Sequence, residues 1–198
     1  MLKPYYNKGI IECGTDEAGR GCLAGSVYAA AVILPEDFSN SLLNDSKQLT
    51  DKQRRELRTI IEQNAISYAV SEVTNVEIDK ANILQSSITA MNKAIEKLNP
   101  EPEFILVDGN RFYTKLKIPF KTIIKGDATY MSIAAASILA KTYRDDAIIE
   151  LSKQYPEYHW DKNKGYPTRE HREAIRKYGI TPLHRKTFNL LGEPSLFE

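Results

Sequence analysis

Apolar residues along the chain fall into short runs typical of strands and spaced stripes typical of helices. Strands are predicted at residues 10–15, 25–34, 66–73, 104–107 and 120–124. The second run is rich in Val, Ala and Ile and stops at Pro35. The fourth is wholly apolar, as expected of a strand covered on both faces of a sheet.

Helical stripes separate the later strands. Thr50 and Gln53 have the spacing of a capping box, which predicts a helix start just after Thr50. Further helices are predicted at residues 76–98, 129–154 and 168–178. Three early strands, followed by helices that alternate with two short strands, favour an α/β fold around a mixed sheet.

The composition is that of a globular domain, with 198 residues, 42% hydrophobic and 27% charged. The longest apolar run, 27–34, is far too short for a membrane span, and the first residues lack the apolar core of a signal peptide. Cys13 and Cys22 are too few for a disulfide framework and are interpreted as reduced thiols. We therefore expect a cytoplasmic protein without membrane contact.

Four acidic residues follow predicted strands. Asp16 and Glu17 follow the first strand, Asp108 follows the fourth, and Asp127 lies between the fifth strand and the long helix. Ligands of open α/β sheets bind at the carboxyl ends of the strands. Clustered carboxylates raise one another's pKa, so a site that keeps them charged needs a cation. Oxygen ligands without nearby Cys or His favour Mg²⁺ or Mn²⁺, a pair of which suits phosphoryl chemistry.

Each acid taken singly also has a structural interpretation. Asp108-Gly109 is a good turn dipeptide, Asp127 could cap the following helix, and Asp16-Glu17 could be a polar strand exit. Neighbouring residues of a regular strand point to opposite faces, so Asp16 and Glu17 can share a site only where the strand ends or bulges. Their joint position at strand exits favours the metal site.

Six ordered motifs carry a family resemblance that covers nearly everything from residue 10 to 188. They are GTDEAGRGCLAGSVYAAAVILP (14–35), DSKQLT (45–50), VDGN (107–110), KGDATYMSIAAASILAKTYRD (125–145), GYPTREH (165–171) and TPLHRKTF (181–188). The chain resembles bacterial ribonuclease HII, the type 2 ribonuclease H. It departs from the family at two positions, because the family usually has proline where Cys22 stands and often has it where Ser26 stands.

The resemblance implies an α/β ribonuclease H-like fold, a five-stranded mixed sheet flanked by helices with a small C-terminal helical part. A catalytic core of residues 1–155 and a substrate-contacting extension of 156–198 would form one domain. The implied catalytic metal ligands, for two Mg²⁺ or Mn²⁺ ions, are Asp16, Glu17, Asp108 and Asp127.

The resemblance also implies substrate-reading residues. Gly19, Arg20 and Gly21 would read the ribonucleotide at an RNA–DNA junction, where the 2′-hydroxyl marks RNA and glycines allow close backbone approach. Tyr166 would pack on the deoxyribose at its 3′ side, and Lys47 would meet a phosphate. The alternatives are a flexible turn, a core aromatic and a solvated lysine.

Residues 162–186 hold eight Lys/Arg and two Glu. Arg169, Arg172 and Arg176 share one helix face, predicted to track the nucleic-acid backbone or simply to be solvated. The three histidines, His159, His171 and His184, lack metal-ligand spacing and are expected to be structural or near the substrate. Ser132 and Ser137 lack a His–acid partner pattern, so a serine nucleophile is not expected.

The expected activity is two-metal hydrolysis of RNA in RNA–DNA hybrids and 5′ of single ribonucleotides in duplex DNA, leaving 5′-phosphate and 3′-hydroxyl ends. The alternatives are ribonuclease HIII, a more distant nuclease of this fold and a catalytically silent hybrid-binding module. We expect a monomer. The apolar Leu196-Phe197 of the tail could bind a replication clamp or could simply fray.

Overall fold

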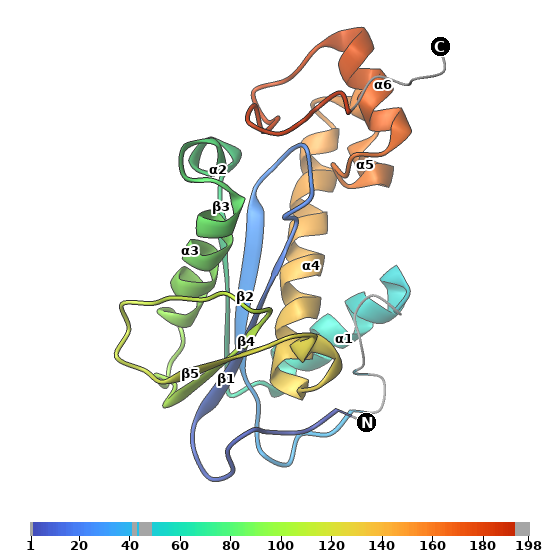
Figure 1. The fold of residues 1–198 in the computed structure, drawn as a ribbon. Helices are drawn as coiled ribbons and strands as arrows, with labels where there is room; N and C mark the ends of the chain where they lie inside the picture. Colours follow the sequence, from blue (N-terminus) through green and yellow to red (C-terminus); the bar gives the residue numbers. More distant parts are fainter. Residues whose placement is uncertain (1, 41–42, 44–48, 193–198) are drawn as a thin grey trace.

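A five-stranded mixed sheet in the order β3-β2-β1-β4-β5 runs through the centre of the molecule (Figure 1). The computed structural model describes residues 2–40, 43 and 49–192. β1 pairs in parallel with β4, and β4 with β5, whereas β2 is antiparallel to both β1 and β3. The carboxyl ends of β1, β4 and β5 therefore point the same way. The strands are β1 (Glu12–Ala18), β2 (Val27–Ile33), β3 (Ser67–Val73), β4 (Phe104–Asp108) and β5 (Phe120–Ile123).

Helices cover both faces of the sheet (Figure 1). α2 (Asn75–Ala81) and α3 (Ile83–Ile95) lie on one face, and α1 (Asp51–Asn64) and α4 (Met131–Ser152) on the other. The pleat of β2 divides its side chains between two cores: Ala29 and Ala31 pack on the α3 side, Ala30 and Val32 on the α4 side. This two-sided burial explains why the strand reads as a continuous apolar run.

The C-terminal elements gather at the far end of α4 (Figure 1). They are η3 (Pro156–Tyr158), α5 (Trp160–Asn163) and α6 (Arg169–Tyr178). Their apolar core also receives Leu23 and Ala24 from the loop between β1 and β2. None of the helices in the described part of the chain combines the length and apolar character that a membrane span requires.

The start of α4 lies directly against β1. A Cβ on Gly14 would stand 2.3 Å from the main-chain carbon of Ser132 and 2.4 Å from the nitrogen of Ile133. Backbone atoms cannot yield as a side-chain end can, so this approach requires glycine. The contact sets the spacing between β1 and α4 next to the acidic residues of β1.

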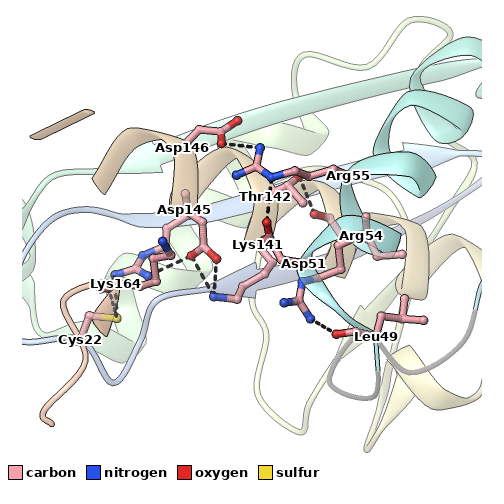
Figure 2. Close-up of polar contacts among 12 residues, drawn as sticks. Cys22, Leu49, Asp51, Arg54, Arg55, Lys141, Thr142, Asp145, Asp146 and Lys164 are labelled. Carbon is pink, nitrogen blue, oxygen red and sulfur yellow. Dashed lines mark hydrogen bonds and ion pairs between the residues drawn. The ribbon is translucent and has the colours of Figure 1, made fainter. Parts of the chain in front are cut away.

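Ion pairs connect α1 with α4 on the surface (Figure 2). Arg55 contacts Asp51 at 2.9 Å and Asp146 at 2.8 Å. Arg58 contacts Asp146 at 2.8 Å and Glu62 at 2.8 Å. Exposed pairs of this kind contribute little to stability singly. Arg55 and Arg58 both reach Asp146, so these pairs join the surfaces of α1 and α4.

The structure corrects two predicted boundaries and confirms others. The helix predicted at 76–98 is two helices, because Asn82 has a φ of +78° and its side chain caps α3 by accepting from the amide of Gln85. The first strand extends beyond residue 15 to Ala18. The capping box of Thr50 and Gln53 is confirmed, with both reciprocal hydrogen bonds present.

Candidate active site

Asp16 and Glu17 lie inside β1 rather than after it, which corrects the predicted strand exit. β1 pairs with β4 only as far as Thr15, opposite Val107, but continues to pair with β2 through Ala18. The two acids therefore extend past the last pair with β4. At these two positions, the edge of β1 that faces β4 therefore has no neighbouring strand.

The pairing of β1 with β2 is regular, so the two acids point to opposite faces. Asp16 points toward α4, where Ser137 hydrogen-bonds its carboxyl group. Glu17 points toward α3 and lines a cavity there. The expected bulge is thus not needed, because the acids meet around the end of β4 rather than on one face.

Asp108 is the last residue of β4 and stands at the end around which they meet. Its Oδ1 accepts a 2.7 Å hydrogen bond from the amide of Gly126. Asp127 follows directly and is almost fully buried in the 3₁₀ turn η2 (Gly126–Ala128). It does not cap α4, whose N-cap is Tyr130 without a side-chain cap bond. One hydrogen bond thus ties the turn that carries Asp127 to Asp108.

The electrostatics show that three of the four carboxyl groups are close together. Burial raises the pKa of Asp16 well above its usual value, and the charges of Glu17 and Asp108 raise it further. Burial also raises the pKa of Glu17, and the charge of Asp108 adds to the rise. Arg20 opposes this rise, because its Nη1 lies 3.0 Å from Oε1 of Glu17. Folding therefore crowds negative charge where a cation would relieve it.

A cavity of about 180 Å³ opens beside these acids. Glu17 and Asp108 face Arg20 from the loop after β1 and Arg111 from the segment after β4. The opposite wall comes from α3, through Ser87 and apolar neighbours. Acidic and basic groups thus share one hollow, as a site for a phosphodiester and a cation would require.

The donor set fits a hard divalent cation in its chemistry, because it offers carboxylate oxygens only. Within the described residues, however, no group of three or more Asp, Glu, His or Cys side chains is arranged so that it could hold a metal ion. Glu17 is engaged by Arg20 instead. The assignment of Asp16, Glu17, Asp108 and Asp127 as ligands stays a prediction.

The loop after β1 carries the predicted substrate readers. Gly19 has a φ of +93°, and a Cβ there would stand 3.1 Å from Nε of Arg144 and 3.4 Å from the carbonyl oxygen of Ser26. A Cβ on Gly21 would meet no atom within 4 Å. Gly19 is therefore required by the fold of the loop, whereas nothing in the fold itself demands glycine at Gly21, which is consistent with a role in close approach to substrate.

Tyr166 is half-buried beside Cys22 and α4. Its ring lies 5.2 Å from the guanidinium of Arg144 and 5.5 Å from Nζ of Lys141. Burial and the adjacent Cys22 raise its pKa to about 12, so its hydroxyl stays protonated. Cys22 and Lys164 lie together at one end of this cluster, next to Asp145 and Lys141 (Figure 2). Tyr166 is thus a partly exposed aromatic residue that packs against Arg144 and Lys141, and it is not part of the core.

The remaining residues predicted to contact nucleic acid have different outcomes in the structure. Lys47 lies outside the described residues. Arg172 donates to the carbonyls of Asn189 and Leu190, and Arg176 to that of Leu191, so both hold the chain's own C-terminal segment. Arg169 pairs with Glu173 on the surface. A structural role for this helix face is thereby favoured over phosphate tracking.

Sequence reasoning missed Ser137, which holds Asp16. The sequence carries no signal for this pairing, which follows from the contact between β1 and α4. Asp16 lies two steps along β1 from Gly14, a rise of about 6.6 Å, and a helix covers that rise in four to five residues. Since Gly14 contacts Ser132 and Ile133, Asp16 should meet a residue near position 137.

Comparisons with known proteins agree with this architecture. The family model described as Ribonuclease HII matches residues 13–191. A curated Ribonuclease HII from Parabacteroides distasonis is 64% identical over 193 residues, covering 98% of this chain and 97% of that protein. The crystal structure of the ribonuclease H2 from Pyrococcus horikoshii OT3 superposes with a TM-score of 0.77 at 28% identity, covering 91% of this chain and 94% of that one.

A further solved structure shares the fold, the PCNA:RNase HII complex from Archaeoglobus fulgidus. Its TM-score is 0.78 at 24% identity, over 94% of this chain and 98% of that one. The expected ribonuclease H-like fold, with a five-stranded mixed sheet in this chain, is thereby confirmed. The chain therefore belongs to the ribonuclease HII family, which makes it a divalent-metal-dependent ribonuclease H that acts on RNA–DNA hybrids.

Proposed function

We propose that this chain also cuts duplex DNA on the 5′ side of a single embedded ribonucleotide, using two divalent cations. The observation that carries the proposal is the mutual repulsion of Asp16, Glu17 and Asp108 beside the Gly19–Gly21 loop. A protein that only binds nucleic acid gains nothing from negative charge placed against phosphates. Crowded carboxylates instead favour metal-assisted hydrolysis.

Asp16, Glu17, Asp108 and Asp127 would hold Mg²⁺ or Mn²⁺. When bound, such ions activate a water for in-line attack on phosphorus and stabilise the departing 3′-oxygen. The products carry a 5′-phosphate and a 3′-hydroxyl. Arg20 contacts Oε1 of Glu17 and is half exposed, so its guanidinium could turn toward a phosphate when Glu17 joins the ligand set.

The chain's own groups prepare this site. The hydroxyl of Ser137 and the amide of Glu17 hold the Asp16 carboxylate, and the amide of Gly126 holds that of Asp108. The Gly19–Gly21 loop would contact the 2′-hydroxyl, Tyr166 the deoxyribose that follows, and Lys47 a phosphate. Residues 156–198 would contact substrate as part of the same domain.

Incubation of a duplex with one embedded ribonucleotide tests the proposal. Mg²⁺ or Mn²⁺ should allow a single cut 5′ of the ribonucleotide, and EDTA should prevent it. An all-DNA duplex is the control for specificity, and a long RNA–DNA hybrid is the control for active enzyme. Cutting of the hybrid without any cut at the single ribonucleotide would overturn the proposed specificity, and binding without cleavage of either would favour the silent module.

Three further predictions concern context. We propose a monomer, a cytoplasmic location, and binding of a sliding clamp through the C-terminal tail, whose Leu196-Phe197 lies outside the described residues. The fold neighbour from Archaeoglobus fulgidus was solved as a complex with PCNA. A pull-down with and without residues 193–198 tests the clamp prediction, and equal recovery of the clamp would contradict it.

A further inference from the structure

We infer that His171 and Arg185 position the two substrate-reading elements, Tyr166 and the Gly19–Gly21 loop, relative to one another. The inference rests on the proposed function and deepens it. Each of the two side chains is fully buried and holds one of the two elements. The spacing between the elements, which an RNA–DNA junction must match, is thus set from the C-terminal segment.

Arg185 holds the loop from inside. Its Nη1 donates to the carbonyl oxygen of Arg20 and its Nε to that of Gly25, both at 2.9 Å. Its main-chain amide donates to Leu23 at 2.8 Å. The third guanidinium nitrogen, Nη2, has no hydrogen-bond partner within the described chain. A buried cation with an unsatisfied donor is costly, so stability alone does not account for an arginine here.

His171 holds Tyr166, and His184 fixes which nitrogen of His171 carries the proton, because donor chemistry sets the direction of each bond. The amide of Thr181 can only donate, so Nδ1 of His184 accepts it at 2.9 Å and the proton of His184 sits on Nε2. Nε2 of His184 lies 3.3 Å from Nε2 of His171. The indole of Trp160 also donates to Nε2 of His171, at 3.0 Å. Nε2 of His171 is therefore an acceptor.

The proton of His171 must then sit on Nδ1, which lies 2.9 Å from the carbonyl oxygen of Tyr166. His171 thus donates to the main chain of the reading residue. Burial lowers the pKa of both histidines, which keeps the neutral forms that this order needs. The amide of Leu23 also donates to the carbonyl of Gly165 at 2.8 Å, so the two elements are joined directly as well.

Two substitutions at one position separate the bonds of His171. The amide of asparagine reaches the place of Nδ1 and can still donate to Tyr166, whereas the amide of glutamine reaches the place of Nε2 and can serve only Trp160 and His184. His171→Gln leaves one buried acceptor unpaired, the carbonyl oxygen of Tyr166, whereas His171→Asn leaves two buried donors unpaired, those of Trp160 and His184. Lower stability therefore does not explain a defect that only the glutamine variant shows. Thermal unfolding and the fluorescence of Trp160, the single tryptophan, verify that both fold.

Kinetics in Mg²⁺ on the single-ribonucleotide duplex and on a long RNA–DNA hybrid decide the inference. His171→Gln should raise KM for the single ribonucleotide about fivefold to tenfold, the effect of one lost hydrogen bond, and leave kcat within about twofold. His171→Asn should stay within about twofold of the wild type in both. Equal effects of the two variants, or an equal effect on both substrates, would overturn the inference.

Arg185→Lys keeps the charge but can reach only one of the two carbonyls, and it should also raise KM for the single ribonucleotide. In the double variant with His171→Gln, KM should rise by less than the product of the two single increases, because both substitutions change the same spacing. Multiplicative effects would mean that the elements are positioned independently. A wild type that cuts the hybrid but ignores the single ribonucleotide would refute the proposed specificity itself, and the positioning of its readers with it.

Discussion

The amide of Gly126 donates a 2.7 Å hydrogen bond to Oδ1 of Asp108, and this bond connects the end of β4 with the turn that carries Asp127. Two acids separated by nineteen positions in the sequence are thereby brought to one edge of the sheet. The bond needs an oxygen acceptor at position 108 but not a negative charge. Structure and chemistry at this residue can therefore be separated by substitution.

Asp108→Asn should retain the fold, because the amide oxygen can still accept from Gly126. Cleavage of an RNA–DNA hybrid should fall by roughly a hundredfold or more, as when one preorganised charged group is removed from an active site. Gel-based cleavage in Mg²⁺ measures the loss, and a binding assay on the same hybrid should show affinity close to that of the wild type. Full activity would remove Asp108 from the mechanism.

Asp16→Asn should stabilise the metal-free protein at neutral pH by about 1 kcal/mol, the usual gain when a strained site group is relieved. Burial and the charges of Glu17 and Asp108 raise the pKa of Asp16 in the folded state. A raised pKa gives stability that is present in acid and is lost as the pH rises through the folded value. Urea unfolding in EDTA at several pH values measures it, and the variant should lack this loss. Unchanged or lower stability at neutral pH would show that the carboxylate is not strained.

Histidine burial should produce a different acid response. Burial lowers the pKa of His184 to about 4 from 6.5, with His171 adding to the effect. A lowered pKa gives stability that is present above 6.5 and lost as the pH falls toward 4, on the order of 3 kcal/mol in all.

His184→Gln is the matched control, because it has no group that titrates in this range. The difference in unfolding free energy between wild type and variant should shrink as the pH falls from about 6.5 to about 4. Unfolding monitored by Trp160 fluorescence measures both. Parallel pH curves would contradict the burial of a neutral His184.

Both thiols should be inert in the folded protein. Cys13 and Cys22 are fully buried, and burial raises the pKa of each, although Arg144 opposes this at Cys22 with Nη2 at 2.8 Å. The thiolate is the reactive form, so a disulfide reagent should titrate no thiol natively and two in denaturant. Activity should also survive dilute hydrogen peroxide. Rapid labelling of Cys22 in the native protein would show that the packing of Cys22 against Arg144 and Tyr166 opens.

Much of the fold was predictable because local patterns carried it. The apolar runs located all five strands, and Thr50 with Gln53 located the start of α1. The motifs also identified Asp16, Glu17 and Asp108, which the structure brings together, while the part of Asp127 in the ligand set stays a prediction. The break at Asn82 escaped, since the apolar stripe continues across it and only a φ of +78° reveals it. The four residues of α5 were too few to show a periodicity.

Periodicity, caps and motif order are properties of neighbouring residues, and the sequence by itself therefore determined the elements, the family resemblance and the identity of the acids. Only the tertiary structure decided that β1 overhangs β4, so that Asp16 and Glu17 meet Asp108 without a bulge. It also decided that His171 accepts a hydrogen bond from His184 at Nε2 and donates one from Nδ1 to the carbonyl oxygen of Tyr166. Strand register, burial and hydrogen bonds between distant segments arise only when the chain packs, because each depends on which surfaces lose water together.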